Sequence, residues 1–169
     1  MKPVTTDPGL TFKSACLGAL AGFLIALPSG LRAADDCRAD RIELRGDWGR
    51  AAFSVEVADT AEERAQGLMF RDAMATGAGM IFVYPEPGPV AFWMKNTRIP
   101  LDMIFADENG QILRVHDNAV PGDLTPIDGG DGVLVVLEIN GGLAGRLGIE
   151  PGDVMRHPAF SGPAPLWPC

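Results

Sequence analysis

The apolar run at residues 133–139 (VLVVLEI) constrains the fold of this chain more than any other feature. A strand with one solvated face alternates apolar and polar residues, and this run shows no alternation. Both of its faces must therefore be covered, and we expect it to form the central strand of a sheet. Its one charged residue, Glu138, is costly to bury without a partner, and we expect Arg64 or Lys95 to be that partner.

Shorter apolar or alternating segments indicate further strands around this run. We expect them at residues 41–44, 52–57, 80–84, 91–94, 101–105, 111–115 and 154–157. Stretches rich in glycine and aspartate at 46–49 and 107–110 are hairpin turn signals, so the strands beside them should pair antiparallel. A stiff proline-rich turn is expected at 85–89 and a long surface loop at 121–132.

Two short helices complete the expected elements. Thr60 and Glu63 form a capping box, and Gly67 ends that helix after about two turns. Asn140 is expected to cap a second helix at 141–147. The pattern predicts a mainly β fold, an antiparallel sandwich or a partly open barrel with two short helices.

Residues 91–105 (AFWMKNTRIPLDMIF) have the pattern of another hairpin. Two apolar strands flank a polar link that ends in Pro100, and the aromatic residues Phe92 and Trp93 precede the link. At the end of this hairpin we expect the polar side chains of Lys95, Asn96, Thr97 and Arg98.

The first 33 residues have the features of a secretory signal peptide. Lys2 and Lys13 precede an apolar run at 15–27, and a small-residue cleavage site precedes Ala34. The alternative is a membrane anchor, but this run is shorter than the roughly 20 residues needed to span a bilayer. We expect a periplasmic or secreted protein with one β-rich domain at 34–169, a proline-rich C-terminal tail and no stable membrane insertion after cleavage.

Charge and cysteine content agree with this interpretation. Three of the 14 basic and one of the 22 acidic residues lie in residues 1–33, which leaves a net charge of −10 and argues against nucleic-acid partners. Two cysteines remain, Cys37 and Cys169, and in an oxidising compartment they can form one bridge. Two free thiols, or pairing with a partner protein, are the alternatives.

Several sequence blocks resemble the domain-of-unknown-function 192 family. They are residues 63–69 (ERAQGLM), 79–82 (GMIF), 92–97 (FWMKNT), 99–102 (IPLD), the strand with Glu138, and 151–153 (PGD). The resemblance spans nearly all of 42–158 and implies a β-sandwich of jelly-roll type, without an agreed activity. Residues 126–131 depart from the family pattern, so the resemblance implies no ligand contact from that loop.

A cluster of polar residues in and beside these blocks suggests a ligand site. Four of its members are basic in an acidic chain, and they could converge on a small anionic or carbohydrate ligand near Phe92 and Trp93. The cluster consists of Arg64, Arg71, Lys95, Asn96, Arg98 and Asp102. The alternative is structural: local ion pairs of Arg64 with Glu62 or Glu63 and of Arg71 with Asp72, Asp102 capping its own hairpin, and a solvated Lys95.

Catalytic and metal chemistry are weaker alternatives. Asp102 and Glu138 could act as acid and base in a hydrolase or lyase of envelope carbohydrate. Six methionines could handle Cu(I), but most lie inside apolar runs: Met69, Met74, Met80, Met94, Met103 and Met155. His116 and His157 lack metal-ligand spacing, and no metal or cofactor is expected. The sequence therefore favours a small exported binding or accessory module, whose partner is a small ligand or an envelope protein.

Overall fold

The computed structural model describes residues 37–160 and 162–169. Its elements in chain order are β1 (Arg41–Gly46), β2 (Gly49–Ala58), α1 (Ala61–Gln66), β3 (Ala78–Phe92), β4 (Leu101–Ala106), β5 (Ile112–Ala119), β6 (Ile127–Asn140), α2 (Leu143–Leu147) and β7 (Val154–Arg156). The expected signal peptide, residues 1–33, lies outside the described residues. No helix among the residues described is long and apolar enough to cross a membrane.

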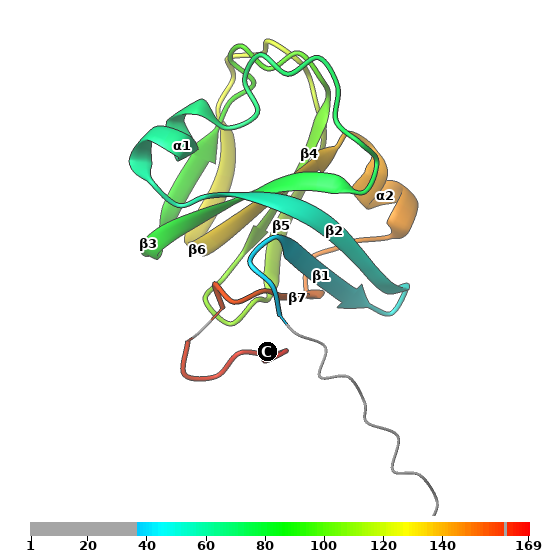
Figure 1. The fold of residues 1–169 in the computed structure, drawn as a ribbon, viewed down its shortest axis with the longest axis vertical. Helices are drawn as coiled ribbons and strands as arrows, with labels where there is room; N and C mark the ends of the chain where they lie inside the picture. Colours follow the sequence, from blue (N-terminus) through cyan, green and yellow to red (C-terminus); the bar gives the residue numbers. More distant parts are fainter. Residues whose placement is uncertain (1–36, 161) are drawn as a thin grey trace, which may run out of the picture. The chain divides into compact units, whose positions relative to one another are not determined.

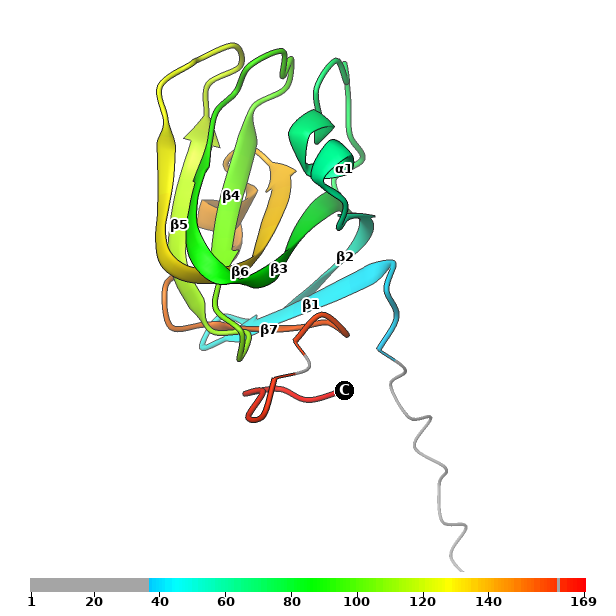
Figure 2. The ribbon, with the colours of Figure 1, turned by 90° about the vertical axis from the view of Figure 1, so that its left-hand side faces the viewer.

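All seven strands belong to one sheet in the order β5-β4-β6-β3-β2-β1-β7. The sheet curls into a half-barrel, with α1 beside one end of β3 and α2 following β6 (Figures 1 and 2). The mainly β class with two short helices is therefore confirmed. Every strand pair is antiparallel except β2 with β3, which are parallel and joined through α1. The sequence patterns did not predict that parallel pair.

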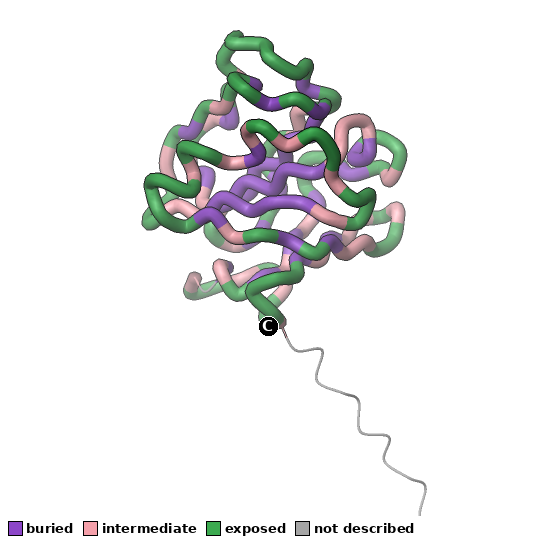
Figure 3. The backbone as a smooth tube through the Cα atoms, turned by 45° about the horizontal axis from the view of Figure 1, so that its top comes forward, coloured by how far each residue is buried: buried purple, intermediate pink, exposed green. Residues whose placement is uncertain are grey.

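β6 is an interior strand between β4 and β3 with both faces covered, as its unbroken apolar run predicted, although β3 holds the middle position of the sheet. Val135, Leu137 and Ile139 pack into the core cluster on one face of the sheet, and Val133 and Val136 pack into the cluster on the other. All five side chains are 0% exposed. In Figure 3 buried residues run along the middle strands, and exposed residues lie in the loops at the periphery.

The hairpin expected at 91–105 does not form. β3 and β4 are not neighbours, because β6 lies between them and pairs antiparallel with both. The buried backbone of β6 needs hydrogen-bond partners on both edges, and these two apolar segments supply them. The link at 93–100 therefore passes from one side of β6 to the other.

The turn expected at 85–89 and the second half of the loop expected at 121–132 are strand. β3 has 15 residues and β6 has 14, and their pairing shifts register between Val83 and Gly88 and again before Ala91. Such bulges bend a strand and tolerate proline, so the proline-rich segment curves without leaving the sheet. Figure 2 shows both long strands following this bend.

The two chain ends of the described domain meet. Cys37 and Cys169 lie at disulfide-bonding distance, with their Cα atoms 5.4 Å apart, as expected from the sequence. The Trp167 indole anchors the tail that precedes Cys169. The guanidinium groups of Arg45 and Arg50 lie 4.6 and 5.1 Å from the centroid of this ring. The tail therefore docks against β1 and β2.

Candidate functional site

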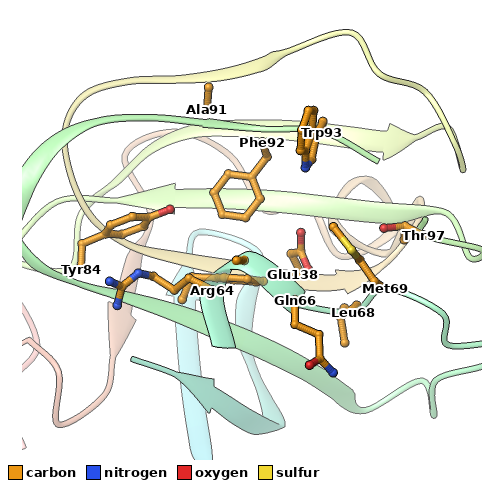
Figure 4. A pocket seen from close by; sticks show the side chains of 13 residues that line it. Arg64, Gln66, Leu68, Met69, Tyr84, Ala91, Phe92, Trp93, Thr97 and Glu138 are labelled. Carbon is orange, nitrogen blue, oxygen red and sulfur yellow. The ribbon is translucent and has the colours of Figure 1, made fainter. Parts of the chain in front are cut away.

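A cavity of about 190 Å³ opens beside α1, and we call it the Glu138 cavity (Figure 4). It is bounded by α1 and the segment after it, by β3, by the link that follows β3 and by one residue of β6. Its lining residues are Arg64, Ala65, Gln66, Gly67, Leu68, Met69, Phe82, Tyr84, Ala91, Phe92, Trp93, Thr97 and Glu138. The predicted meeting of the Arg64 segment with the Trp93 segment is therefore observed.

Glu138 is the acidic group of the cavity. It lies on β6, directly opposite Met80 of β3 and Met103 of β4, and is 4% exposed. Within the described chain its carboxyl makes no hydrogen bond or ion pair, so the expected pairing with Arg64 or Lys95 is wrong. Burial raises the pKa of Glu138 to about 8. The carboxyl is thus mostly protonated at neutral pH in the empty cavity.

Aromatic rings form the wall opposite Glu138. The rings of Phe82 and Phe92 meet edge to face with their centroids 5.0 Å apart, and this contact fixes the orientation of Phe92. Trp93 is half exposed at the mouth, and the Tyr84 hydroxyl has a raised pKa, mainly through burial. In Figure 4 the Glu138 carboxyl points toward Phe92 and Trp93.

Arg64 lies at the rim and has a structural role. Its guanidinium donates hydrogen bonds to the carbonyl oxygens of Asp59 and Val83, the second at 2.9 Å, and so ties α1 to β3. The same group lies 5.2 Å from the Tyr84 ring centroid. Figure 4 shows it turned toward Tyr84 and away from Glu138. The alternative pairing with Glu62 or Glu63 does not form either.

Three other predicted residues lie around the cavity without lining it. The Lys95 ammonium is 5.0 Å from the Trp93 ring centroid, and the Asn96 amide lies 3.8 Å from the Met69 sulfur. Arg71 forms an ion pair with Glu56 that lowers the pKa of Glu56, and not the alternative pair with Asp72.

Asp102 lies on the other face of the sheet. It is directly opposite Ile139 on β6, so its side chain and that of Glu138 point in opposite directions. Its oxygens accept backbone hydrogen bonds from Asn118, Gly142 and Ala144 at 2.6 to 2.7 Å. The predicted acid and base pair is therefore wrong, because the sheet separates the two carboxyls.

Asp102 also corrects the predicted start of α2. Gly142, not Asn140, is the N-cap, and it has no side-chain cap of its own. Asp102 on β4 takes the place of a side-chain cap, because its carboxylate accepts hydrogen bonds from the backbone N–H groups of Gly142 and Ala144. Its carboxylate raises the pKa of nearby Asp117.

The metal-site alternatives gain no support from the described residues. Met80, Met94, Met103 and Met155 are core residues, which leaves their thioethers unavailable to an ion at the surface. Across residues 37–160 and 162–169, no three His, Cys, Asp or Glu side chains are grouped to hold a metal. His157 is buried and hydrogen-bonded to the backbone of Ala39 and Ala159, and burial lowers its pKa.

The sequence also held a signal for lining residues that the prediction missed. Met80, Phe82 and Tyr84 alternate along β3, and the register places Met80 opposite Glu138. Residues at this spacing share one face of a strand. Pairing the strand at 80–84 with the central run would therefore have placed Phe82 and Tyr84 on the same face as Glu138.

These features define a small half-barrel domain with an aromatic, carboxyl-bearing cavity beside α1. Residues 42–157 match the sequence profile of the domain-of-unknown-function 192 family, described as an uncharacterized ACR. The chain belongs to this family. No curated protein gives a match.

Two solved structures share the fold and much of the sequence. One is a protein of unknown function from Novosphingobium aromaticivorans, 46% identical, with 69% of this chain and 83% of that chain covered and a TM-score of 0.67. The other is described as a putative transcription regulator from Sinorhizobium meliloti, 41% identical, with 73% of this chain and 97% of that chain covered and a TM-score of 0.69. These likenesses establish the fold and the family, and they assign no activity to this chain.

Proposed function

We propose that this protein is a small exported binding module that holds a small organic ligand in the Glu138 cavity. The observation that carries the proposal is the Glu138 carboxyl, which is buried, faces a cavity and has no partner in the described chain. A carboxyl that opens only onto a small cavity, and that no group of the described chain pairs with, costs free energy that a ligand can recover. Such a group at the wall of a cavity is a good candidate for the contact that orients a ligand.

The cavity limits the size and shape of that ligand. Its volume of about 190 Å³ is below the roughly 300 to 1,000 Å³ of sites for drug-sized molecules. A single ring or a short branched chain fits this volume. Its apolar side would contact Phe92 and Trp93, and its polar group would reach Glu138.

The same geometry weakens the proposal of an anionic ligand. Arg71 and Arg98 form ion pairs with Glu56 and Asp72, and so are engaged outside the cavity. Arg64 is directed at backbone carbonyls and at Tyr84. A carbohydrate ring remains compatible with the aromatic wall.

Export is part of the proposal. Its support is the leader pattern of residues 1–33 together with Cys37 and Cys169 at disulfide-bonding distance, an arrangement that persists in oxidising compartments. In that setting the module would meet small molecules of the periplasm or the medium.

The test is a fragment screen by two-dimensional NMR on the purified, oxidised protein. The panel contains monosaccharides, uronic acids, small amines and small aromatic alcohols. We expect hits to shift the Gly67 and Thr97 amides and the Trp93 indole signal, all of which belong to the cavity lining. Trp93→Ala should abolish these shifts, while Trp167→Ala, in the tail, should leave them. Hits that map only to other surfaces, or no hits at all, would contradict the proposal.

A further inference from the structure

Resting on the proposed function, we infer that the ligand of the Glu138 cavity is a small organic cation whose ammonium group pairs with the Glu138 carboxylate. Its apolar part would lie against Phe92 and Trp93. The inference adds a ligand class to the proposed site, and it replaces the anion suggested by the basic residues of the sequence.

The Glu138 carboxyl has no counter-charge within the described chain. Glu138 is flanked across both neighbouring strands by methionines, Met80 and Met103, and these are 6% and 0% exposed. Neither can donate a hydrogen bond. The strong acceptor of the cavity thus lacks a donor within the described chain, and a cation is the ligand type that satisfies a carboxylate most fully.

An aromatic wall faces this carboxyl across the cavity. Ring faces attract cations, and tryptophan does so most strongly. Two rings at this site already contact cationic side chains, because Lys95 lies 5.0 Å from the Trp93 centroid and Arg64 lies 5.2 Å from the Tyr84 centroid. A carboxylate combined with aromatic faces in one small cavity is suited to an organic ammonium ion.

The charges at the cavity disfavour an anionic ligand. Among the described residues that line it, Arg64 carries the one cationic side chain, and its guanidinium is engaged with Asp59, Val83 and Tyr84. An anion would therefore meet no uncommitted cationic side chain in the lining. The net charge of −8 on the whole chain also favours the approach of cations.

Binding of a cation should be linked to a proton. Burial raises the pKa of Glu138 to about 8 in the empty cavity, so a cation that pairs with the carboxylate must displace a proton at neutral pH. The charged or titratable groups around it are Arg64 from α1, Tyr84 from β3 and Lys95 from the link, while β4 contributes the uncharged Met103. Burial raises the pKa of the Tyr84 hydroxyl above its ordinary value, so this group stays protonated between pH 6 and pH 8.

The experiment is isothermal titration calorimetry with matched probe pairs at pH 8. Choline is compared with its uncharged carbon isostere dimethylbutanol, and benzylamine, which is charged at this pH, is compared with benzyl alcohol. We expect the charged member of at least one pair to bind about tenfold or more tightly than its neutral partner. The affinity of choline should fall about tenfold for each pH unit below 8, with close to one proton released for each molecule bound at pH 7.

Two variants assign the effect to one carboxyl. Glu138→Gln keeps the shape of the side chain and should reduce the charged-to-neutral preference to about threefold or less. Glu108→Gln removes an exposed carboxylate from the turn between β4 and β5 and should leave that preference unchanged. If Glu138→Gln fails to fold, the pH profile and proton release of the unaltered protein still decide the matter.

Failure of this inference can be told apart from failure of the proposed function. Charged probes that bind no better than their neutral partners, or choline binding without proton release, would overturn the cationic ligand. If fragment hits then still map to the cavity, the binding module stands with a neutral ligand. If they do not, the proposed function fails as well.

Discussion

Glu138 is at once 4% exposed, adjacent to a cavity and without a partner in the described chain. The sequence correctly indicated that burying Glu138 costs free energy, because its carboxylate interrupts an otherwise apolar run. The sequence could not indicate what compensates that free energy. The sequence pattern pointed to a basic partner, whereas in the structure the carboxyl faces the cavity and burial raises its pKa.

The raised pKa of Glu138 predicts how stability depends on pH. An unfolded glutamate titrates near 4.5 and the folded one near 8, so between these values the folded protein holds a proton that the unfolded chain releases. The contribution of Glu138 to stability therefore falls as pH rises from 4.5 to 8, by up to about 1.4 kcal/mol for each pH unit.

Urea denaturation of the unaltered protein and of Glu138→Gln, compared from pH 5 to pH 8, checks this prediction. The variant should become the more stable of the two as pH rises. Glu108→Gln is the control and should follow the unaltered protein. A stability difference between the unaltered protein and Glu138→Gln that does not change with pH would mean that Glu138 titrates normally in the fold.

At the level of elements, local signals were predictable and long-range pairing was not. The capping box of Thr60 and Glu63 starts α1 as its sequence indicates, since it satisfies backbone N–H groups within one turn. The neighbours of β3 and β4 depend on which distant strand offers a free edge, and no local pattern encodes that choice. The cavity depends on the same pairing, because it brings Glu138 of β6 beside β3.

Two of the family's sequence blocks have different roles in the structure. Residues 92–97 contribute Phe92, Trp93 and Thr97 to the cavity. The PGD block at 151–153 stabilises the fold instead, because Asp153 accepts hydrogen bonds from the Trp48 indole at 2.6 Å and from the Glu150 backbone at 3.0 Å.

Asp102 joins α2 and β5 to β4, and its removal should be costly. Asp102→Ala leaves the N–H groups of Asn118, Gly142 and Ala144 without their acceptor. We expect the free energy of unfolding to fall by about 3 kcal/mol, with a smaller loss for Asp102→Asn, which keeps one oxygen. Chemical denaturation measures both losses.

The control for this comparison is Asp131→Ala, which removes an exposed carboxylate from β6 and should change stability by less than about 0.5 kcal/mol. An Asp102→Ala protein as stable as that control would show that the helix start is satisfied in another way. A role of Asp102 in ligand binding is not expected, because the sheet separates it from the cavity.

At the scale of the whole molecule, the two ends of the domain hold each other. Cys37 and Cys169 are separated by 132 residues in sequence and lie together in space. The tail has further anchors, because Arg45 donates to the Leu166 carbonyl and the Leu166 N–H donates to Asn109. The pairing was predictable from cysteine content, whereas the docking of the tail on β1 and β2 was not.

Reduction of this pair should destabilise the domain without unfolding it. Closing so long a loop stabilises a fold by about 4 to 5 kcal/mol in the chain-entropy treatment, and Cys37→Ser with Cys169→Ser should lose that amount. Urea midpoints with and without reductant check the prediction, and the double variant should not respond to reductant. Equal midpoints for the oxidised and reduced protein would mean that the two cysteines do not pair.

The ionisation of Glu138 in the ligand-free protein is the property on which the binding proposals depend most. It can be measured by carbon-13 NMR titration of the glutamate side-chain carboxyl signals, with Glu138→Gln used to assign the resonance. The structure predicts a midpoint near pH 8. A midpoint near the ordinary value of 4.5 would contradict the binding proposals. The carboxyl would then already be solvated or paired in the ligand-free protein, and a ligand would gain little by contacting it.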